Sequence, residues 1–69
     1  MTSGREQGSA WQMAESQLSE LQNMRMLLEE ARGLSRNLAY HRRVRLESTI
    51  GEALEEVDRQ IEELRTARG

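Results

Sequence analysis

The sequence predicts an all-α protein, an antiparallel helical hairpin or coiled coil. Apolar residues recur at every third or fourth position from Trp11 onward, which is the period of an α-helix and not of a strand. The chain has no proline to interrupt a helix. Its 69 residues, 32% of them charged, suit helices with one apolar stripe better than a sealed globule. The apolar stripes of such helices must pack against each other or against another chain.

The N-terminal part of the chain differs from the rest. Residues 1–8 are small and polar and include two glycines, so we expect a flexible tail there and a helical domain over residues 9–69. Ser9 followed by Gln12 fits a capping box, which would start the first helix.

The first helical half carries a broad apolar surface. One stripe is formed by Trp11, Ala14, Leu18, Leu21 and Leu28, and the adjacent side adds Met13, Met24, Leu27 and Ala31. A stripe wider than one helix contact requires indicates two neighbours, and methionine adapts to irregular partner surfaces.

The preferred turn between the two helices is at Gly33. Glycine supplies the left-handed cap with which many helices end. An antiparallel hairpin turned here would place Leu18 opposite Ile50. It would also leave Ile61 and Leu64 overhanging the start of the first helix.

Two other arrangements are open at this point. A turn near residues 41–48 would set Leu28 against Ile61 and Met24 against Leu64. With no turn at all, one continuous helix would have to form a coiled coil with other chains.

The second half is a narrow apolar seam on an acidic helix: Ile50, Leu54, Val57, Ile61 and Leu64. Together with the breadth of the first half, it predicts a partner-binding surface formed by Met24, Leu27, Ala31, Leu34, Ile61 and Leu64. The alternative is that these side chains fill the hairpin's own core.

Composition argues against several classes of function. The net charge of −2 gives no general attraction to nucleic acid or an anionic membrane. There is no cysteine, and His41 is the only histidine, so we expect no metal site and no cofactor. No nucleophile has a base at recognisable spacing, so we expect no enzyme. No apolar run approaches the length of a membrane span and no secretory signal is present, so we expect a cytoplasmic protein.

The segment 34–46 is strongly basic. Arg36, Arg42, Arg43 and Arg45 face no acidic residue there, and Tyr40 lies among them. Arginines could contact phosphates while Tyr40 stacks on a base. Charge pairing within the chain or with a partner is the simpler interpretation, because the following segment is acidic and the net charge is negative. Nucleic-acid binding is therefore disfavoured.

A family resemblance adds a specific hypothesis. Ala31-Arg32-Gly33, Tyr40 and the run from Leu46 to Leu64 resemble the short cytosolic co-chaperones of type III secretion needles, the YscE/PscE-like proteins. These are antiparallel helical hairpins of similar length. The resemblance implies that the hairpin packs on a tetratricopeptide-like chaperone, and that the two together keep the needle subunit from polymerising.

Two classes of function thus compete. The first is a non-enzymatic co-chaperone or adaptor that binds a different chain. The second is a structural homo-oligomeric coiled coil that binds only itself.

Overall fold

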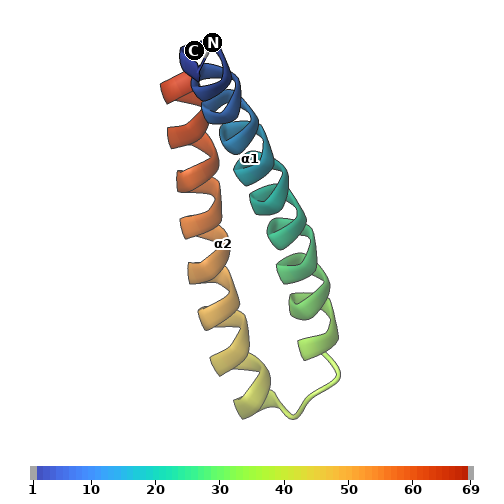
Figure 1. Cartoon of the computed structure of the whole chain (residues 1–69). Coiled ribbons are helices and arrows are strands. Elements are labelled where there is room, and N and C mark those ends of the chain that lie inside the picture. The colour runs from blue at the N-terminus through green and yellow to red at the C-terminus, as the bar shows by residue number, and fades with distance from the viewer. Residues whose placement is uncertain (1, 69) are drawn as a thin grey trace.

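The chain forms two long α-helices joined by a short turn, as a computed structural model shows (Figure 1). Helix α1 covers Thr2–Ser35 and helix α2 covers Tyr40–Arg68. The structure describes the backbone of residues 2–68 and the side chains of residues 13–67. The molecule is long and thin, measuring 59 × 17 × 13 Å along its principal axes. The predicted all-α antiparallel helical hairpin is confirmed.

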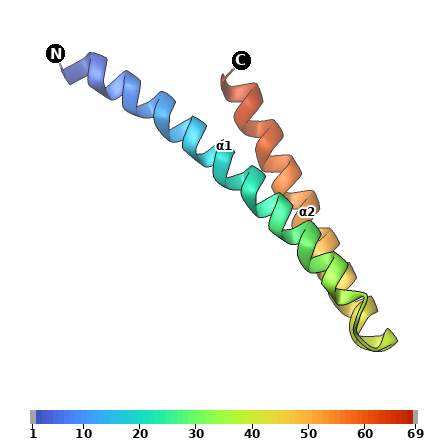
Figure 2. The same ribbon diagram turned by 90° about the vertical axis from the view of Figure 1, so that its right-hand side faces the viewer.

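The two helices cross. In Figure 1 their ribbons are apart at the turn and overlap at the chain ends, whereas Figure 2, turned by 90°, shows them overlapping near the turn and apart at the ends. They are therefore inclined to one another instead of running parallel along their whole length. Close packing is confined to a limited stretch of each helix.

The core is small and is supplied by the middle of α2. Among the side chains that the structure describes, the buried hydrophobic ones are Leu54, Val57 and Ile61, which are 5–7% exposed. Leu18, Leu21 and Leu28 are the partly buried leucines of α1. Burying one such side chain stabilises a fold by about 1.5–3 kcal/mol. Three of them make a weak core for a chain of this length.

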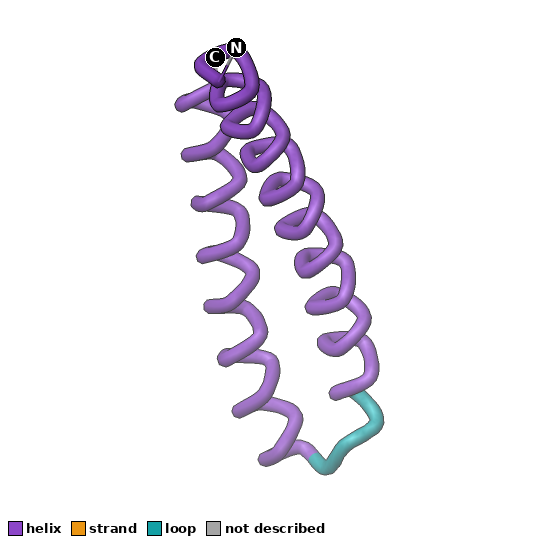
Figure 3. The backbone as a smooth tube through the Cα atoms, in the orientation of Figure 1, coloured by secondary structure: helices purple, strands orange, loops and turns teal. Residues whose placement is uncertain are grey.

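The turn follows Gly33 by three residues and occupies residues 36–39, the teal segment of Figure 3. Three successive bonds of the i→i−3 type tighten the end of α1. They run from the amide nitrogens of Arg36, Asn37 and Leu38 to carbonyl oxygens at 3.3, 3.1 and 3.1 Å. The Ser35 hydroxyl, which is buried, donates to the Arg32 carbonyl at 2.7 Å.

The predicted turn at Gly33 is therefore wrong. Gly33 lies inside α1, and no described residue has a positive φ, so no left-handed cap is formed. Helix α2 runs unbroken through residues 41–48 and Gly51, so the second arrangement is also wrong. The continuous helix is excluded because the chain reverses direction between Ser35 and Tyr40.

The register of the two helices differs from the predicted one as well. The Arg25 Nε lies 2.8 Å from the Asp58 Oδ1 and so ties the last third of α1 to the middle third of α2. A pairing of Leu18 with Ile50 would instead have put Arg25 near residues 42–43. The later turn and the inclination of the helices move the opposing residues of α2 toward its C-terminus.

The start of α1 also precedes the expected one. The helix begins at Thr2 and continues through Gly8, so the backbone shows no boundary at Ser9. A single glycine costs a helix about 1 kcal/mol, which the neighbouring turns can offset. Met1 and the side chains of Ser9, Trp11 and Gln12 lie outside the described residues. The expected flexibility of residues 1–8 and the capping box stay predictions.

Candidate protein-binding face

Helix α1 exposes a row of large apolar side chains beside its packed side. Met24, Leu27 and Leu34 are 49%, 60% and 68% exposed. They sit about a quarter turn around α1 from Leu21 and Leu28, which lean toward α2. The helix is therefore apolar on one side where nothing in the chain covers it.

The row has regular spacing. Met24, Leu27, Ala31, Leu34 and Leu38 follow one another at steps of three, four, three and four residues. This is the spacing with which helices present a seam to a partner helix. Leu38 lies in the turn and not in α1; it is 42% exposed and lines a hollow together with Leu46 of α2.

Helix α2 adds to the same side of the hairpin. In an antiparallel pair, residues rotated from the core in the same sense on both helices lie on the same broad face. Leu46 is rotated from Leu54 and Val57 in the sense in which the α1 row is rotated from its core residues, and it is 43% exposed. We call this surface the apolar face and define it by Met24, Leu27, Ala31, Leu34, Leu38 and Leu46.

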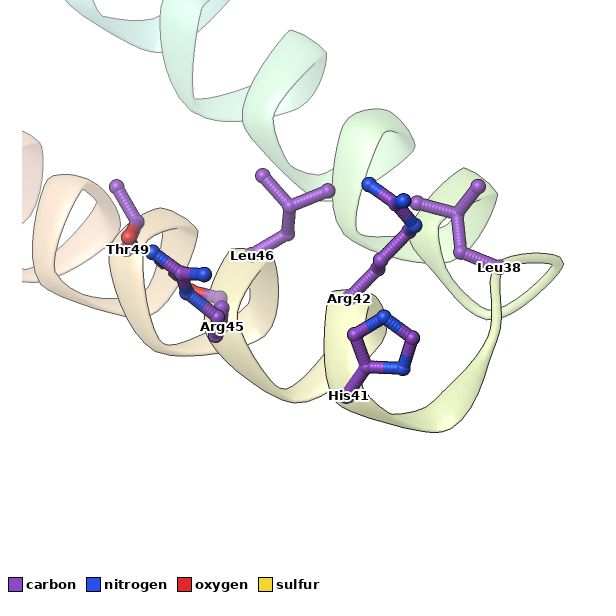
Figure 4. Close-up of a pocket in the computed structure, with 6 residues that line it drawn as sticks. All are labelled: Leu38, His41, Arg42, Arg45, Leu46 and Thr49. Carbon is purple, nitrogen blue, oxygen red and sulfur yellow. Dashed lines mark hydrogen bonds between the residues drawn. The ribbon is translucent and has the colours of Figure 1, made fainter.

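A shallow hollow of about 630 Å³ lies on the α2 part of this face, at the turn. Figure 4 shows Leu38 and Leu46 turned to the same side with Arg42 between them. Its polar lining is His41, Arg42, Arg45 and Thr49. The hollow is thus lined by two leucines together with basic and polar side chains.

The opposite face of the hairpin carries ion pairs, one of which joins the two helices. Arg25 and Asp58 join the two helices at 2.8 Å, and Arg43 approaches Glu47 at 3.8 Å. Glu29 accepts from Arg32 at 2.8 Å, close to the helix contact. We call this surface the ion-pair face. These pairs are partly exposed and each contributes only about 0.2–1 kcal/mol, but they make this face a solvated one.

The basic segment is divided between the two faces. Arg43 lies on the ion-pair face with its guanidinium carbon 5.4 Å from the centre of the Tyr40 ring. By contrast, Arg42 and Arg45 make no ion pair with any residue whose side chain the structure describes. Two cations beside the apolar face are therefore available to acidic groups from outside the chain.

Four of the six predicted partner-binding residues come together in the structure. Met24, Leu27, Ala31 and Leu34 lie on one side of α1, as the spacing predicts. The expectation for Ile61 is wrong, because this side chain is 7% exposed and belongs to the core. Leu64 is partly buried on α2. Neither overhangs α1, because Asp58 lies opposite Arg25 and α1 extends from there back to Thr2.

Sequence reasoning missed two residues of the face. Leu38 continues the three–four spacing beyond Leu34, but a turn at Gly33 would separate it from the residues of the first helix. Leu46 lies four residues before Ile50, so its spacing alone does not separate it from the apolar seam of the second half. Only the position of the turn brings these two leucines beside Arg42 and Arg45.

The apolar face consists mainly of hydrocarbon side chains, which can pack against a partner. His41, on the rim of the hollow, is exposed. Among the described residues no group of His, Cys, Asp and Glu side chains could hold a metal ion. Within the same residues, neither helix is apolar over a length that would cross a bilayer. Comparison with protein-family models, with curated proteins and with solved structures finds no match to this chain.

Proposed function

We propose that this chain is a non-enzymatic helical protein-binding module that docks through its apolar face. One observation carries the proposal: exposed large apolar side chains recur every three or four residues on one face, whereas the ion pair between the two helices lies on the other face. Isolated apolar residues are normal on a protein surface, but a contiguous row marks an interaction site.

The small free energy of unfolding expected for this hairpin favours a form in which a partner is bound. The core contains three buried hydrophobic side chains among the described residues, whereas nine large ones remain exposed, five of them on the apolar face. Native proteins are stable by only about 5–15 kcal/mol, and small single cores lie at the lower end. A partner that covers the apolar face would stabilise the hairpin by mass action. We therefore propose that the protein works in a complex with another chain.

The narrower role of a type III secretion co-chaperone is the less supported form of this proposal. Of the features that carry the resemblance, Tyr40 does open the second helix. However, Gly33 lies within α1 and does not form the turn. The apolar face would suit a tetratricopeptide-like groove, but equally any helical surface with the same spacing.

The experiment compares two methionines on the same helix. Met24 and Met26 are similarly exposed, at 49% and 55%, but Met26 points away from the apolar face. The tagged chain is recovered from its source cells as wild type, Met24→Asp and Met26→Asp, and the size and composition of each complex are read by native mass spectrometry. We expect the wild type and Met26→Asp to stay bound and Met24→Asp to bind at least tenfold more weakly, because a buried unpaired carboxylate is costly.

Circular dichroism on the purified variants checks that both keep their helical structure. We expect equal helix content, because both variants carry the same new residue in α1. An unbound wild type, or equal behaviour of the two variants, would contradict the proposal.

A further inference from the structure

We propose that the hollow at the turn binds an acidic segment of a partner protein, in which carboxylate side chains flank a large apolar one. This inference rests on the proposed function and gives the chemistry of the partner at one end of the apolar face. The carboxylates pair with Arg42 and Arg45, while the apolar side chain packs on Leu38 and Leu46, all four of which line the hollow.

The hollow combines exposed leucines and exposed arginines within a short stretch of chain. Leu38 and Leu46 are 42% and 43% exposed. On the surface of α2, Arg42 neighbours both Arg45 and Leu46, because residues three and four apart in a helix lie side by side. Figure 4 shows the side chain of Arg42 between those of the two leucines. A segment that fits the hollow therefore needs apolar atoms for the leucines and negative charge for the arginines.

Arg42 and Arg45 have no acidic neighbour on their own helix. Arg32, Arg43 and Arg59 each pair with a glutamate three or four residues away. By contrast, no acidic residue lies three or four positions from Arg42 or from Arg45. Neither arginine makes an ion pair with any residue whose side chain the structure describes. The carboxylates that could pair with them belong to another molecule.

The start of α2 carries the opposite charge to the one that a helix favours there. The N-terminal end of a helix is positive, so acidic residues stabilise the first turn. The first turn of α2 has no acidic residue and instead contains His41, Arg42 and Arg43. Departures from a local rule of this kind are expected at functional sites. A carboxylate in the hollow would meet both lining arginines and the positive end of α2.

The charge along α2 favours a short acidic segment over an extended polyanion. Residues 31–46 contain no acidic residue, whereas residues 47–69 carry seven acidic residues and three arginines. A nucleic acid strand or an anionic membrane that reached past the hollow would therefore be repelled. The ring of Tyr40 lies against Arg43, outside the hollow, so it offers no surface for stacking to a base bound there.

The position of the hollow also gives a direction to the partner. The exposed row of Met24, Leu27 and Leu34 runs along α1 toward the turn, and the hollow lies at that end. A partner helix that covers the row would carry its acidic residues at the end that reaches the turn. Charge complementarity of this kind determines orientation more than affinity.

The first test neutralises the two arginines. The tagged chain is recovered from its source cells as Arg42→Gln with Arg45→Gln, and separately as Arg36→Gln with Arg65→Gln. The second pair is the matched control, because it removes the same charge from exposed arginines that do not line the hollow. We expect the first pair to lower the partner recovered, read by native mass spectrometry, about tenfold or more, and the control to leave it unchanged. Equal effects of the two pairs would overturn the site.

Thermal unfolding of the free variant separates lost contact from lost fold. The midpoint for Arg42→Gln with Arg45→Gln should be no lower than that of the wild type, because a cation has been removed from the positive end of α2. Weaker binding by an equally stable hairpin places the loss at the contact itself. A lower midpoint would show that the arginines stabilise the hairpin and would overturn their assignment to a partner.

The second test identifies the bound group. The chain contains no lysine, so Arg42→Lys introduces a single side-chain amine and keeps the positive charge. A carbodiimide joins an amine to a carboxylate in direct contact through an amide bond. In the complex, we expect Arg42→Lys to be linked to an aspartate or glutamate of the partner, identified by mass spectrometry of the digested product. Arg65→Lys, outside the hollow, is the control and should form no such link.

Two results of this test would overturn the acidic segment. One is a complex in which Arg42→Lys forms no link to a carboxylate. The other is recovery of nucleic acid or of lipid in place of a second protein.

The outcomes separate this inference from the proposed function. If Met24→Asp removes the partner and neutralisation of Arg42 and Arg45 does not, the proposed function stands and the acidic segment is overturned. If neither change removes the partner, both fail. Loss of the partner through the arginines alone would keep the hollow as the binding site and overturn docking through the apolar face.

Discussion

At the scale of single residues, Gly33 is the position at which local and long-range effects are most easily separated. A glycine after Arg32 has the local features of a helix C-cap, and many helices end in this way. In the structure it is an ordinary helical residue of α1 without a positive φ. A β-carbon built on it, or on Gly51 of α2, meets no atom within 4 Å.

Gly33→Ala should therefore stabilise the hairpin by about 0.5–1 kcal/mol, because alanine loses less backbone entropy in a helix. Thermal unfolding at one fixed chain concentration measures this as an upward shift of the midpoint by several degrees. Gly51→Ala is the matched comparison and should shift the midpoint in the same direction. A left-handed Gly33 would give the opposite result, a loss of stability on substitution by alanine.

At the scale of the element, α2 supplies the core and α1 supplies the surface for association. Val57 is 5% exposed and Val44 of the same helix is 44% exposed on the other side. The same substitution, valine to alanine, can therefore be made at one position inside the contact between the helices and at one position outside it. Both positions lie well within α2, so helix propensity changes equally.

Val57→Ala should destabilise the hairpin by about 2 kcal/mol, from the lost burial of two methyl groups and the cavity left behind. Val44→Ala should change its stability by less than about 0.5 kcal/mol. Chemical denaturation of both variants, at the same chain concentration as the wild type, gives the two values. Equal losses would mean that α2 packs through a different side than the structure shows.

At the scale of the whole molecule, the register of the helices is the property with most consequence for function. It decides that Ile61 is inside the core, and that Leu38 and Leu46 lie together beside Arg42 at the turn. The cross-helix contact of Arg25 with Asp58 is the observation that defines it. This exposed ion pair shows which residues lie opposite one another, but it is too weak to determine the register by itself.

Spin labels measure the register directly. Labels at positions 25 and 58 should be close together, as neighbours across the helix contact. Labels at 18 and 50 should be about 25 Å apart, because the two positions differ in height by roughly fifteen residues of helical rise. Pulsed dipolar spectroscopy, with the labelled chain diluted in unlabelled chain, reads the distance within one molecule. A shorter 18–50 than 25–58 distance would contradict the observed register.

The sequence alone determined the class of fold and most of the apolar face. Helical periodicity is a local property, so the all-α hairpin and the grouping of Met24, Leu27, Ala31 and Leu34 on one side of a helix could be read from spacing alone. The tertiary structure decided where the chain turns, which α2 residues oppose α1, and hence that Ile61 is buried while Leu38 and Leu46 flank Arg42. The physical reason is that apolar stripes repeating every three or four residues can pack in several registers of similar energy. The choice among them depends on a few long-range contacts and on how the turn closes, which no local pattern records.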